Sequence, residues 1–299
     1  MGSLFGGLLA QTGQQVTLVD INDAHLEAIR NKGLRLETDT GDCLVNTLRV
    51  CRPEKATEQP DLLIVFTKAL HTNAALTGVQ HLLTKDVYVL SLQNGLGNVE
   101  AIAQNVSREQ ILIGVTTWPA DMVEPGHVHS HGEGMVRLMT ADGSVRPIVM
   151  KVAETLSAAG LRCSADPTVW AAIWEKVAFN AALNSICAVS GCTVDQLGTV
   201  PDGEELTYSV VYEVLSVARR LGIIVDEARC KNNVATAIAQ HRGHKPSMLQ
   251  DIQAGRRTEI ESINGAVVTA AHQLDIAVPH TATLLTLVRL MEGRGLLKA

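Results

Sequence analysis

The hydrophobic pattern of the chain changes once, near residue 165, and this change constrains the fold more than any other feature. Before it, short β-rich runs alternate with stretches of helical period. The predicted strands are Gln15–Asp20, Asp61–Lys68, Asp86–Leu92 and Ile111–Val115, and the predicted helices between them cover residues 23–33, 71–83 and 97–106. Near-continuous apolar strands that alternate with helices are typical of a parallel sheet covered on both faces.

After residue 165 the strand pattern ends and apolar residues recur at three- and four-residue spacing. The predicted helices are 168–190, 202–222, 226–241, 247–272 and 280–293, separated by Gly or Pro. A chain of 299 residues suits two domains at roughly 150 residues each. The sequence therefore predicts an α/β domain over residues 1–165 and an all-helical domain over residues 166–299.

The composition excludes several classes of protein. Lys and Arg total 25 and Asp and Glu total 31, so the net charge of −6 argues against binding to nucleic acid. The most apolar stretch, Val169–Val189, carries Glu175 and Lys176 in its middle and is not expected to span a membrane. The six cysteines are scattered without a CxxC pair, and the first residues lack the basic region of a signal peptide. We therefore expect a cytoplasmic protein.

Polar residues follow the predicted strands at their carboxyl ends. In an open parallel sheet these ends form the ligand crevice, which we expect between the two domains. Lys68 follows one strand and Asn94-Gly95 follows the next. A solvated lysine and a plain turn are the alternatives, but their coincidence at neighbouring strand ends favours a ligand site.

Asp20 ends the strand Gln15–Asp20, where an acidic residue can accept both ribose hydroxyls of an adenosine; a simple turn residue is the alternative. A first strand and a Gly-x-Gly-x-x-Gly turn should precede it. Met1–Ala10 resembles the helix after such a turn, with Gly2 as its third glycine. The same sequence pattern also fits an ordinary Gly-rich helix. Since the strand and two glycines are missing, we expect Met1 to be an internal methionine of a longer chain.

Three polar residues form a stripe on the predicted helix 168–190. Lys176, Asn180 and Asn184 are spaced at i, i+4 and i+8 among apolar neighbours. Burying an ammonium and two amides without partners is costly. A stripe that faces a polar ligand explains them better than a solvated face does.

The segment from Ser247 onward has two interpretations. Ser247 could cap a helix, with Gln250 completing a capping box, and Glu259 could be a surface acid. The alternative interpretation, a ligand-binding role, comes from the order of these residues along the chain together with the earlier motifs.

Taken together, these motifs resemble the ketopantoate reductase (2-dehydropantoate 2-reductase) family of pantothenate biosynthesis, from residue 1 to about residue 295. The resemblance rests on the following segments: the Gly2 helix, Lys68, Asn94-Gly95, Gly114-Val115-Thr116-Thr117, Pro125-Gly126-His127-Val128, the Lys176/Asn180/Asn184 helix, Ser247–Asp251, Thr258-Glu259-Ile260 and Ile263-Asn264-Gly265. It implies a Rossmann-like sheet, with its first strand absent here, followed by a helical domain.

The resemblance also implies an oxidoreductase that transfers hydride from NADPH to the C2 ketone of ketopantoate. Lys176 would donate the proton to the developing alkoxide, and Glu259 would anchor the substrate or the nicotinamide ribose beside it. The implied substrate contacts are Asn180, Asn184 and Ser247. The implied cofactor contacts are Gly2, Asp20, Lys68, Asn94, Ala120 and Glu259.

The chain departs from the family pattern in ways that leave alternatives open. Asp20 and Asp23 would repel a 2′-phosphate, so NADH is possible in place of NADPH. His244 stands where the family often has Asn. The alternatives are a reductase of another branched 2-oxoacid and an inactive dinucleotide-binding relative; the polar set argues against the latter. We expect a small-molecule 2-oxoacid substrate, no nucleic-acid or membrane partner, and a monomeric or homodimeric protein.

Three imidazoles, His127, His129 and His131, share one face of a possible strand. No Cys or carboxylate at matching spacing completes a metal site, so we expect no bound metal.

Overall fold

A computed structural model describes residues 1–296 of the chain, which divide into two compact units. The first unit comprises residues Met1–Gln93 and Asn98–Val169, and the second comprises Asn94–Gly97 and the residues from Trp170 onward. The second unit therefore takes four residues from the middle of the first. The mixed α/β class and the helical C-terminal part confirm the predicted fold class.

The chain begins with helix α1 (Gly2–Gln11), as expected for the segment that starts at Gly2. Two adjacent glycines let α1 approach the strands beneath it. A Cβ on Gly6 would lie 2.5 Å from Leu18, and a Cβ on Gly7 would lie 2.5 Å from Leu36. Larger residues at these two positions would force the ends of the Leu18 and Leu36 side chains to shift.

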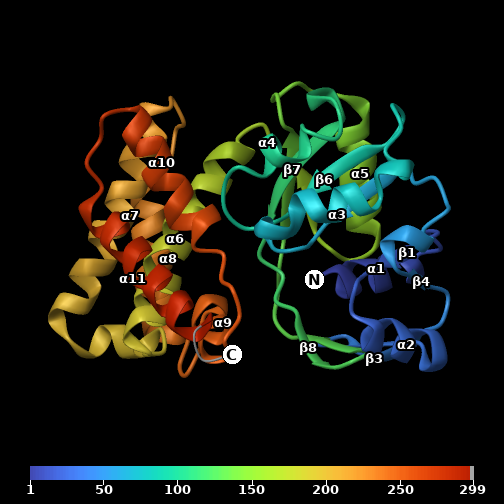
Figure 1. The fold of residues 1–299 in the computed structure, drawn as a ribbon, viewed down its shortest axis with the longest axis horizontal. Helices are drawn as coiled ribbons and strands as arrows, with labels where there is room; N and C mark the ends of the chain where they lie inside the picture. The colour runs from blue at the N-terminus through green and yellow to red at the C-terminus, as the bar shows by residue number, and fades with distance from the viewer. Residues whose placement is uncertain (297–299) are drawn as a thin grey trace. The chain divides into compact units, whose positions relative to one another are not determined.

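The main sheet of the first unit has the strand order β11-β10-β7-β6-β5. Its strands are β5 (Leu62–Val65), β6 (Tyr88–Ser91), β7 (Ile111–Thr116), β10 (Val136–Thr140) and β11 (Cys163–Ala165). Strands β5, β6 and β7 are parallel, whereas β10 runs antiparallel to β7. The predicted strands of this sheet are thus parallel, and β10, which was not predicted, is antiparallel to β7 because the β8–β9 hairpin rather than a crossover helix leads from β7 to β10. Helices α3 (Thr72–Gly78) and α5 (Pro147–Ala158) lie on opposite faces of this sheet (Figure 1).

The other strands of the first unit form two smaller sheets. Strand β1 (Thr17–Val19) pairs with β4 (Arg49–Cys51), and a four-stranded sheet has the order β3-β2-β9-β8. Its strands are β2 (Leu34–Thr38), β3 (Gly41–Val45), β8 (Asp121–Glu124) and β9 (His127–Ser130). The remaining helices of this unit are α2 (Asp23–Lys32) and α4 (Asn98–Ile102). The apolar pattern did not predict the four-stranded sheet, because its strands are short and two of them, β3 and β8, are largely exposed.

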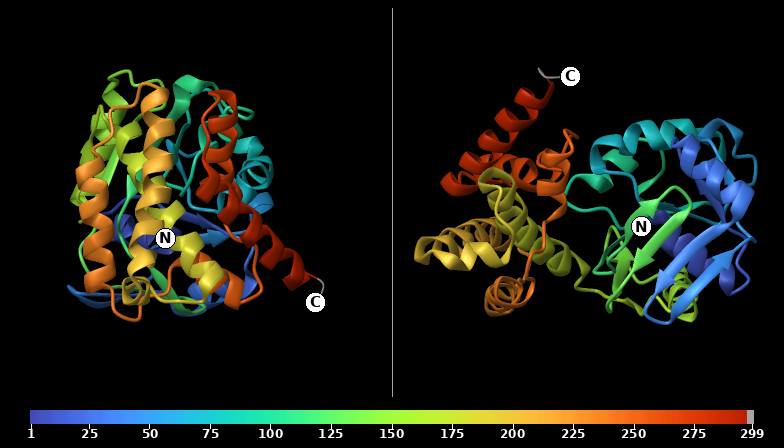
Figure 2. Two further views of the ribbon diagram at one scale, coloured as in Figure 1. Left: turned by 90° about the vertical axis from the view of Figure 1, so that its left-hand side faces the viewer. Right: turned by 90° about the horizontal axis from the view of Figure 1, so that it is seen from below.

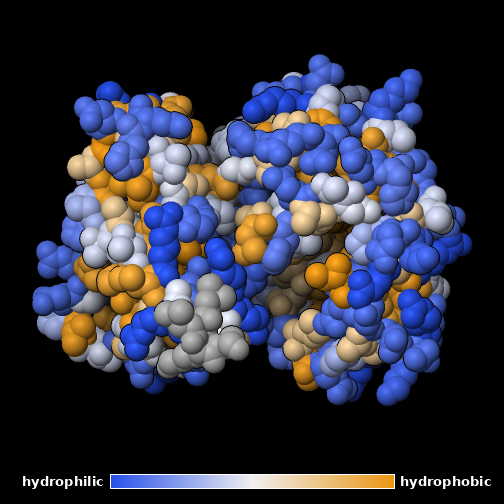
Figure 3. Space-filling view, viewed as in Figure 1, coloured by the Kyte–Doolittle hydropathy of each residue, from blue (hydrophilic) through white to orange (hydrophobic). Residues whose placement is uncertain are grey.

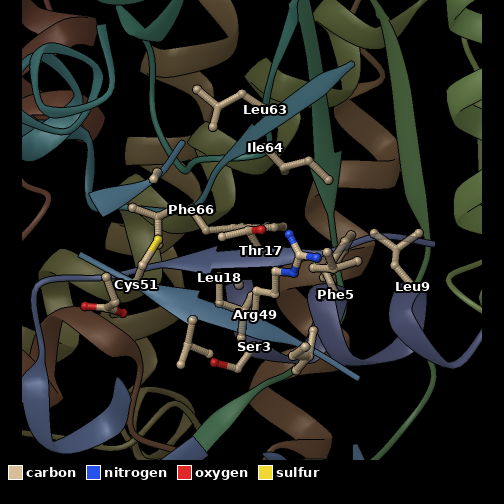
Figure 4. Close-up of a pocket in the computed structure, with 18 of the residues that line it drawn as sticks. Ser3, Phe5, Leu9, Thr17, Leu18, Arg49, Cys51, Leu63, Ile64 and Phe66 are labelled. Atoms are coloured by element: carbon tan, nitrogen blue, oxygen red, sulfur yellow. The ribbon is translucent and has the colours of Figure 1, made fainter. Parts of the chain in front are cut away.

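Strands β1 and β5 border a cavity of about 1820 Å³. Within residues 1–296, β1 pairs with β4 and β5 pairs with β6, and no strand lies between them. Figure 4 shows Leu63 and Ile64 of β5 on one side of this cavity and Thr17 and Leu18 of β1 on the other.

The second unit consists of helices. They are α6 (Val169–Ser190, whose first residue belongs to the first unit), α7 (Pro201–Arg220), α8 (Glu227–Gln240), α9 (Ser247–Gln253), α10 (Ala266–Gln273) and α11 (Pro279–Leu296). Helix α7 packs against α8, α10 and α11 (Figures 1 and 2). Most predicted helices are confirmed within two residues at each end. None of the helices that the structure describes combines the length and the apolar character needed to cross a membrane.

The prediction of one continuous helix over residues 247–272 is wrong. Helix α9 ends at Gln253, and Gly255 adopts a φ of +66°, which breaks the helix. The chain becomes helical again in a π-helical turn, Glu261–Gly265, which leads directly into α10. The break places Glu259 two residues before the start of a π turn. Single π turns inside helices are frequent at functional sites.

Candidate active site

The predicted polar stripe lies on α6, in the second unit. Asn180 and Asn184 are 8% and 7% exposed, and Lys176 is half-buried. Neither asparagine has a side-chain hydrogen bond within residues 1–296, and yet neither amide is sealed from solvent. The two amides on this nearly buried helix therefore have hydrogen-bonding capacity that a polar ligand could use.

Lys176 is the titratable residue of this stripe, and its pKa is shifted from the ordinary value of a lysine. Burial lowers the pKa of its ammonium to about 8, while the negative charge of Glu259 acts in the opposite direction. A lysine with this pKa is largely protonated at neutral pH and still able to release its proton. This behaviour suits a general acid.

Glu259 is held by a residue from a distant part of the sequence. The Nδ2 of Asn94 donates a hydrogen bond of 3.0 Å to Oε2 of Glu259. Asn94 follows strand β6 in sequence but belongs to the second unit. The structure therefore brings together three predicted residues, Lys176, Glu259 and Asn94.

Ser247 opens α9 and is exposed. The helix cap is Pro246, and the Gln250 amide donates to the carbonyl of Lys245, so the capping-box alternative is wrong. The hydroxyl of Ser247 forms no hydrogen bond with the described residues. It is available to a ligand, but the structure shows no contact between it and Lys176.

The other predicted cofactor residues lie in the first unit. Gly2, Asp20 and Lys68 line the cavity beside β1 and β5, whereas Ala120, between β7 and β8, does not. Oδ1 of Asp20 accepts hydrogen bonds from the backbone amides of the next two residues, at 2.7 and 2.9 Å. These bonds fix the carboxylate at the end of β1.

The charges near Asp20 bear on the choice of cofactor. Arg52, the cation close to this strand end, forms a bidentate pair with Asp23 at 2.6 and 2.5 Å. Its charge is therefore neutralised. Arg30 reaches the carbonyl of Val50. This surrounding favours a ribose with free hydroxyls over a 2′-phosphate.

Two residues with structural roles were not predicted: Gln93, which follows β6, and Asn264, in the π turn. The Gln93 side chain, at the end of β6, donates to the carbonyl of Thr67 at 2.7 Å, which ties the ends of β5 and β6 together. Asn264 is fully buried in the π turn and donates to the carbonyl of Ala181 on α6 at 3.2 Å. Only the motif Ile263-Asn264-Gly265 marked this position in the sequence, and it indicated no role.

The three imidazoles near β9 are paired with carboxylates from neighbouring strands. His127 and His131 both contact Glu37, at 3.1 and 3.5 Å, and His131 also contacts Asp39 at 2.9 Å. The part of the chain that the structure describes contains no group of side chains that could hold a metal ion.

Comparisons with known proteins match the whole chain. The family model described as ketopantoate reductase PanE/ApbA matches residues 1–143, and the model of the C-terminal part of the same family matches residues 168–292. The chain belongs to the ketopantoate reductase family. The predicted family is therefore confirmed.

Named relatives in this family cover nearly the full length of both chains. The 2-dehydropantoate 2-reductase of Streptococcus pyogenes serotype M3 is 34% identical over 98% of this chain and 95% of its own. The enzyme of the same name from Halobacterium salinarum is 35% identical over 99% of this chain and 97% of its own.

Solved structures of ketopantoate reductase relatives share the fold. D-mandelate dehydrogenase, in a complex with NADH and anilino(oxo)acetate, superposes with a TM-score of 0.93 at 30% identity, covering 99% of this chain and 96% of its own. The 2-dehydropantoate 2-reductase of Geobacter metallireducens gives 0.89 at 27% identity, covering 96% and 95%. The fold is thus common to enzymes named for two different substrates.

Proposed function

We propose that this chain is a 2-dehydropantoate 2-reductase, which reduces the C2 ketone of ketopantoate to the alcohol of pantoate in pantothenate biosynthesis. The observation that carries the proposal is the group formed by Lys176, Glu259 and Asn94, next to the open amides of α6. This group supplies what reduction of a ketone requires from a protein, namely a proton and a fixed counter-charge.

A dinucleotide fits the residues of the first unit at its adenosine end. The cavity there is lined by Gly2 at the start of α1, by the anchored carboxylate of Asp20, and by Lys68. The amides at a helix start suit a pyrophosphate, and Asp20 suits ribose hydroxyls. When bound, the reduced nicotinamide supplies the hydride for C2 of the substrate.

Lys176 would act on the oxygen of the ketone. As the hydride arrives at C2, the C=O bond becomes a C–O single bond and its electron pair moves to oxygen. The ammonium of Lys176 stabilises that charge and transfers one proton to it, leaving a neutral amine that regains a proton from solvent. Glu259 favours the protonated state of Lys176 before the reaction, because its charge raises the pKa that burial lowers.

The remaining polar residues of the second unit would bind the substrate. Asn180 and Asn184 each offer an amide donor and acceptor on the same face of α6 as Lys176. Ser247 offers a hydroxyl that suits a carboxylate. We assign these three residues to the hydroxyl, carbonyl and carboxylate groups of the 2-oxoacid.

A second candidate function is the reduction of another 2-oxoacid with NADH. The neutralised Arg52 and the carboxylate of Asp20 disfavour the 2′-phosphate of NADPH, the cofactor of the ketopantoate reductase family. The likeness to D-mandelate dehydrogenase supports the same alternative. An inactive relative is disfavoured, because it would have no use for the costly polar stripe on α6.

The test follows the absorbance of NADPH and of NADH, separately, with ketopantoate and with an aromatic 2-oxoacid such as benzoylformate. A higher kcat/KM for ketopantoate with either cofactor supports the main proposal. A higher value for benzoylformate would transfer the assignment to the second candidate. No oxidation of either cofactor with any 2-oxoacid would overturn both.

We also propose a cytoplasmic location and a monomeric or homodimeric state. All six cysteines are free thiols, which suits a reducing compartment. Size-exclusion chromatography with light scattering measures the oligomeric state directly.

A further inference from the structure

The loop Asn94–Gly97 is attached to the π turn that follows Glu259. The backbone N–H of Leu96 donates to the carbonyl of Ser262 at 2.8 Å. Two residues earlier, the side chain of Asn94 donates to Glu259. The loop therefore contacts this turn at two points, one through its backbone and one through its side chain.

Ser262 and Glu259 are joined to each other within the turn. Both the N–H and the hydroxyl of Ser262 donate to the carbonyl of Glu259, at 3.1 Å each. The π turn is closed by the N–H of Gly265, which reaches back to Ile260 at 2.9 Å. Because of these bonds, the position of the Ser262 carbonyl fixes the position of the residue that carries the catalytic carboxylate.

Gly95 is the residue that allows the loop to come this close. A Cβ at Gly95 would lie 2.4 Å from the carbonyl oxygen of Ser262 and 2.7 Å from its carbonyl carbon. Both atoms belong to the backbone, so they cannot move aside as a flexible side chain would. Any side chain at position 95 must lift the loop from the turn.

We propose that Gly95 is a positioning residue, which lets the loop close on Ser262 and so sets the amide of Asn94 against Glu259, beside Lys176. This inference rests on the proposed function. No contact with substrate or cofactor is assigned to Gly95. It acts through Asn94, whose hydrogen bond restrains the carboxylate that acts on Lys176.

The chain offers a matched control two residues away. Gly95 and Gly97 have nearly the same backbone angle, with φ of +82° and +83°. A Cβ at Gly97 would meet no atom within 4 Å. Gly95→Ala and Gly97→Ala therefore impose the same left-handed strain, and only the first also pushes against Ser262.

The primary readout is the pKa of Lys176, measured without substrate from the pH dependence of its labelling by an amine-reactive reagent and mass spectrometry. In Gly95→Ala we expect this pKa to fall below that of the unaltered protein, because the restraint on Glu259 is lost. In Gly97→Ala we expect it to stay unchanged. Equal pKa values in all three proteins, with all three folded by circular dichroism, would overturn the proposal.

Turnover gives the second readout. We expect kcat to fall roughly ten- to a hundred-fold in Gly95→Ala, the size of effect that a misplaced catalytic group produces, and to change little in Gly97→Ala. If no substrate is turned over by the unaltered enzyme, the proposed function fails while the labelling result still decides this inference.

A third variant covers the case in which Gly95→Ala does not fold. Asn94→Ala keeps the backbone N–H of Leu96 that donates to Ser262 and removes the side-chain bond to Glu259. The same fall in the pKa of Lys176 is expected. An unchanged pKa in this variant would contradict the link from the loop to Glu259.

Discussion

Glu259 opposes the effect that burial has on Lys176: the buried ammonium has a pKa lowered to about 8, and the carboxylate keeps it from falling further. Because only the protonated form can donate, we expect kcat to decline as the pH rises through about 8. In Glu259→Gln the opposing charge is gone, so the decline should begin at a lower pH. A pH profile of kcat at saturating substrate measures both. An unchanged profile in Glu259→Gln would show that Glu259 does not act on the proton donor.

Replacement of Lys176 should separate activity from stability. Lys176→Met keeps the length of the side chain and removes the ammonium, and we expect kcat to fall by roughly 10²–10⁴, with little change in cofactor affinity. Near-normal turnover would exclude Lys176 as the acid.

The same variant has a stability signature with a definite sign. The pKa of Lys176 is about 8 in the folded protein and near its ordinary 10.5 when unfolded. Between these values the unfolded state binds more protons, so the free energy of unfolding gains a contribution that rises with pH. Lys176→Met lacks this contribution and should be the more stable protein at pH 7. Urea unfolding at pH 7 and 9.5 tests this; a variant that is less stable at both values would contradict the burial argument.

The assignment of substrate contacts predicts a selective change in KM. Asn184→Ala and Ser247→Ala should raise the KM for the 2-oxoacid roughly tenfold or more and leave the KM for the cofactor nearly unchanged. Asn232→Ala, at an exposed position on α8, is the control and should alter neither constant. Equal effects on both constants would remove Asn184 and Ser247 from the substrate site.

Asp20 predicts the direction of cofactor preference. In Asp20→Ser we expect weaker binding of NADH and tighter binding of NADPH, since the variant loses an acceptor for ribose hydroxyls and a charge that repels phosphate. Glu27→Gln removes a charge from the exposed side of α2 and controls for net charge. Fluorescence titration of each cofactor gives the ratio of dissociation constants. A ratio that is the same in Asp20→Ser and Glu27→Gln would show that Asp20 does not select the cofactor.

The cavity between β1 and β5 predicts that an added strand will stabilise the first unit. Among residues 1–296, the facing edges of these strands have no strand partner. An unpaired backbone group that is shielded from water costs about 1–3 kcal/mol. An engineered fusion ahead of Met1, with five β-branched residues and a Gly-x-Gly-x-x turn, should raise Tm and tighten dinucleotide binding. A Gly/Ser fusion of equal length is the control. Equal Tm values for the two fusions would contradict the expected stabilisation by an added strand.

The elements that could be predicted from sequence are those with a strong apolar period. Helix α6 and strand β7 fall within one or two residues of their predicted limits, because nearly every side chain on them is buried. Strand β2 alternates between buried Leu34 and Leu36 and exposed Arg35, but it is only five residues long and was not recognised. Strand β3 could not be predicted, since most of its residues are exposed and give no alternation. The break between α9 and the π turn was also missed, because one glycine inside a periodic stretch does not reveal its φ.

In the candidate site, too, some features could be predicted from local sequence and others could not. The stripe of Lys176, Asn180 and Asn184 could be recognised because polar residues on an apolar helix are costly to bury. The hydrogen bond from Asn94 to Glu259 could not, because it joins residues 165 positions apart. The role of Gly95 depends on where Ser262 lies, and no local pattern carries that information.

The assignment of residues 94–97 to the second unit has a consequence for synthesis of the chain in the cell. A ribosome that adds about 5–20 residues per second makes Glu259 about 8 to 33 seconds after Asn94. The first unit is by then almost entirely outside the exit tunnel, while its borrowed loop still lacks the turn on which it docks. The loop must stay accessible for that interval, and its attachment becomes a late step of maturation. Nascent chains stalled before residue 259 should therefore be cleaved at this loop by added protease, and released full-length chains should resist.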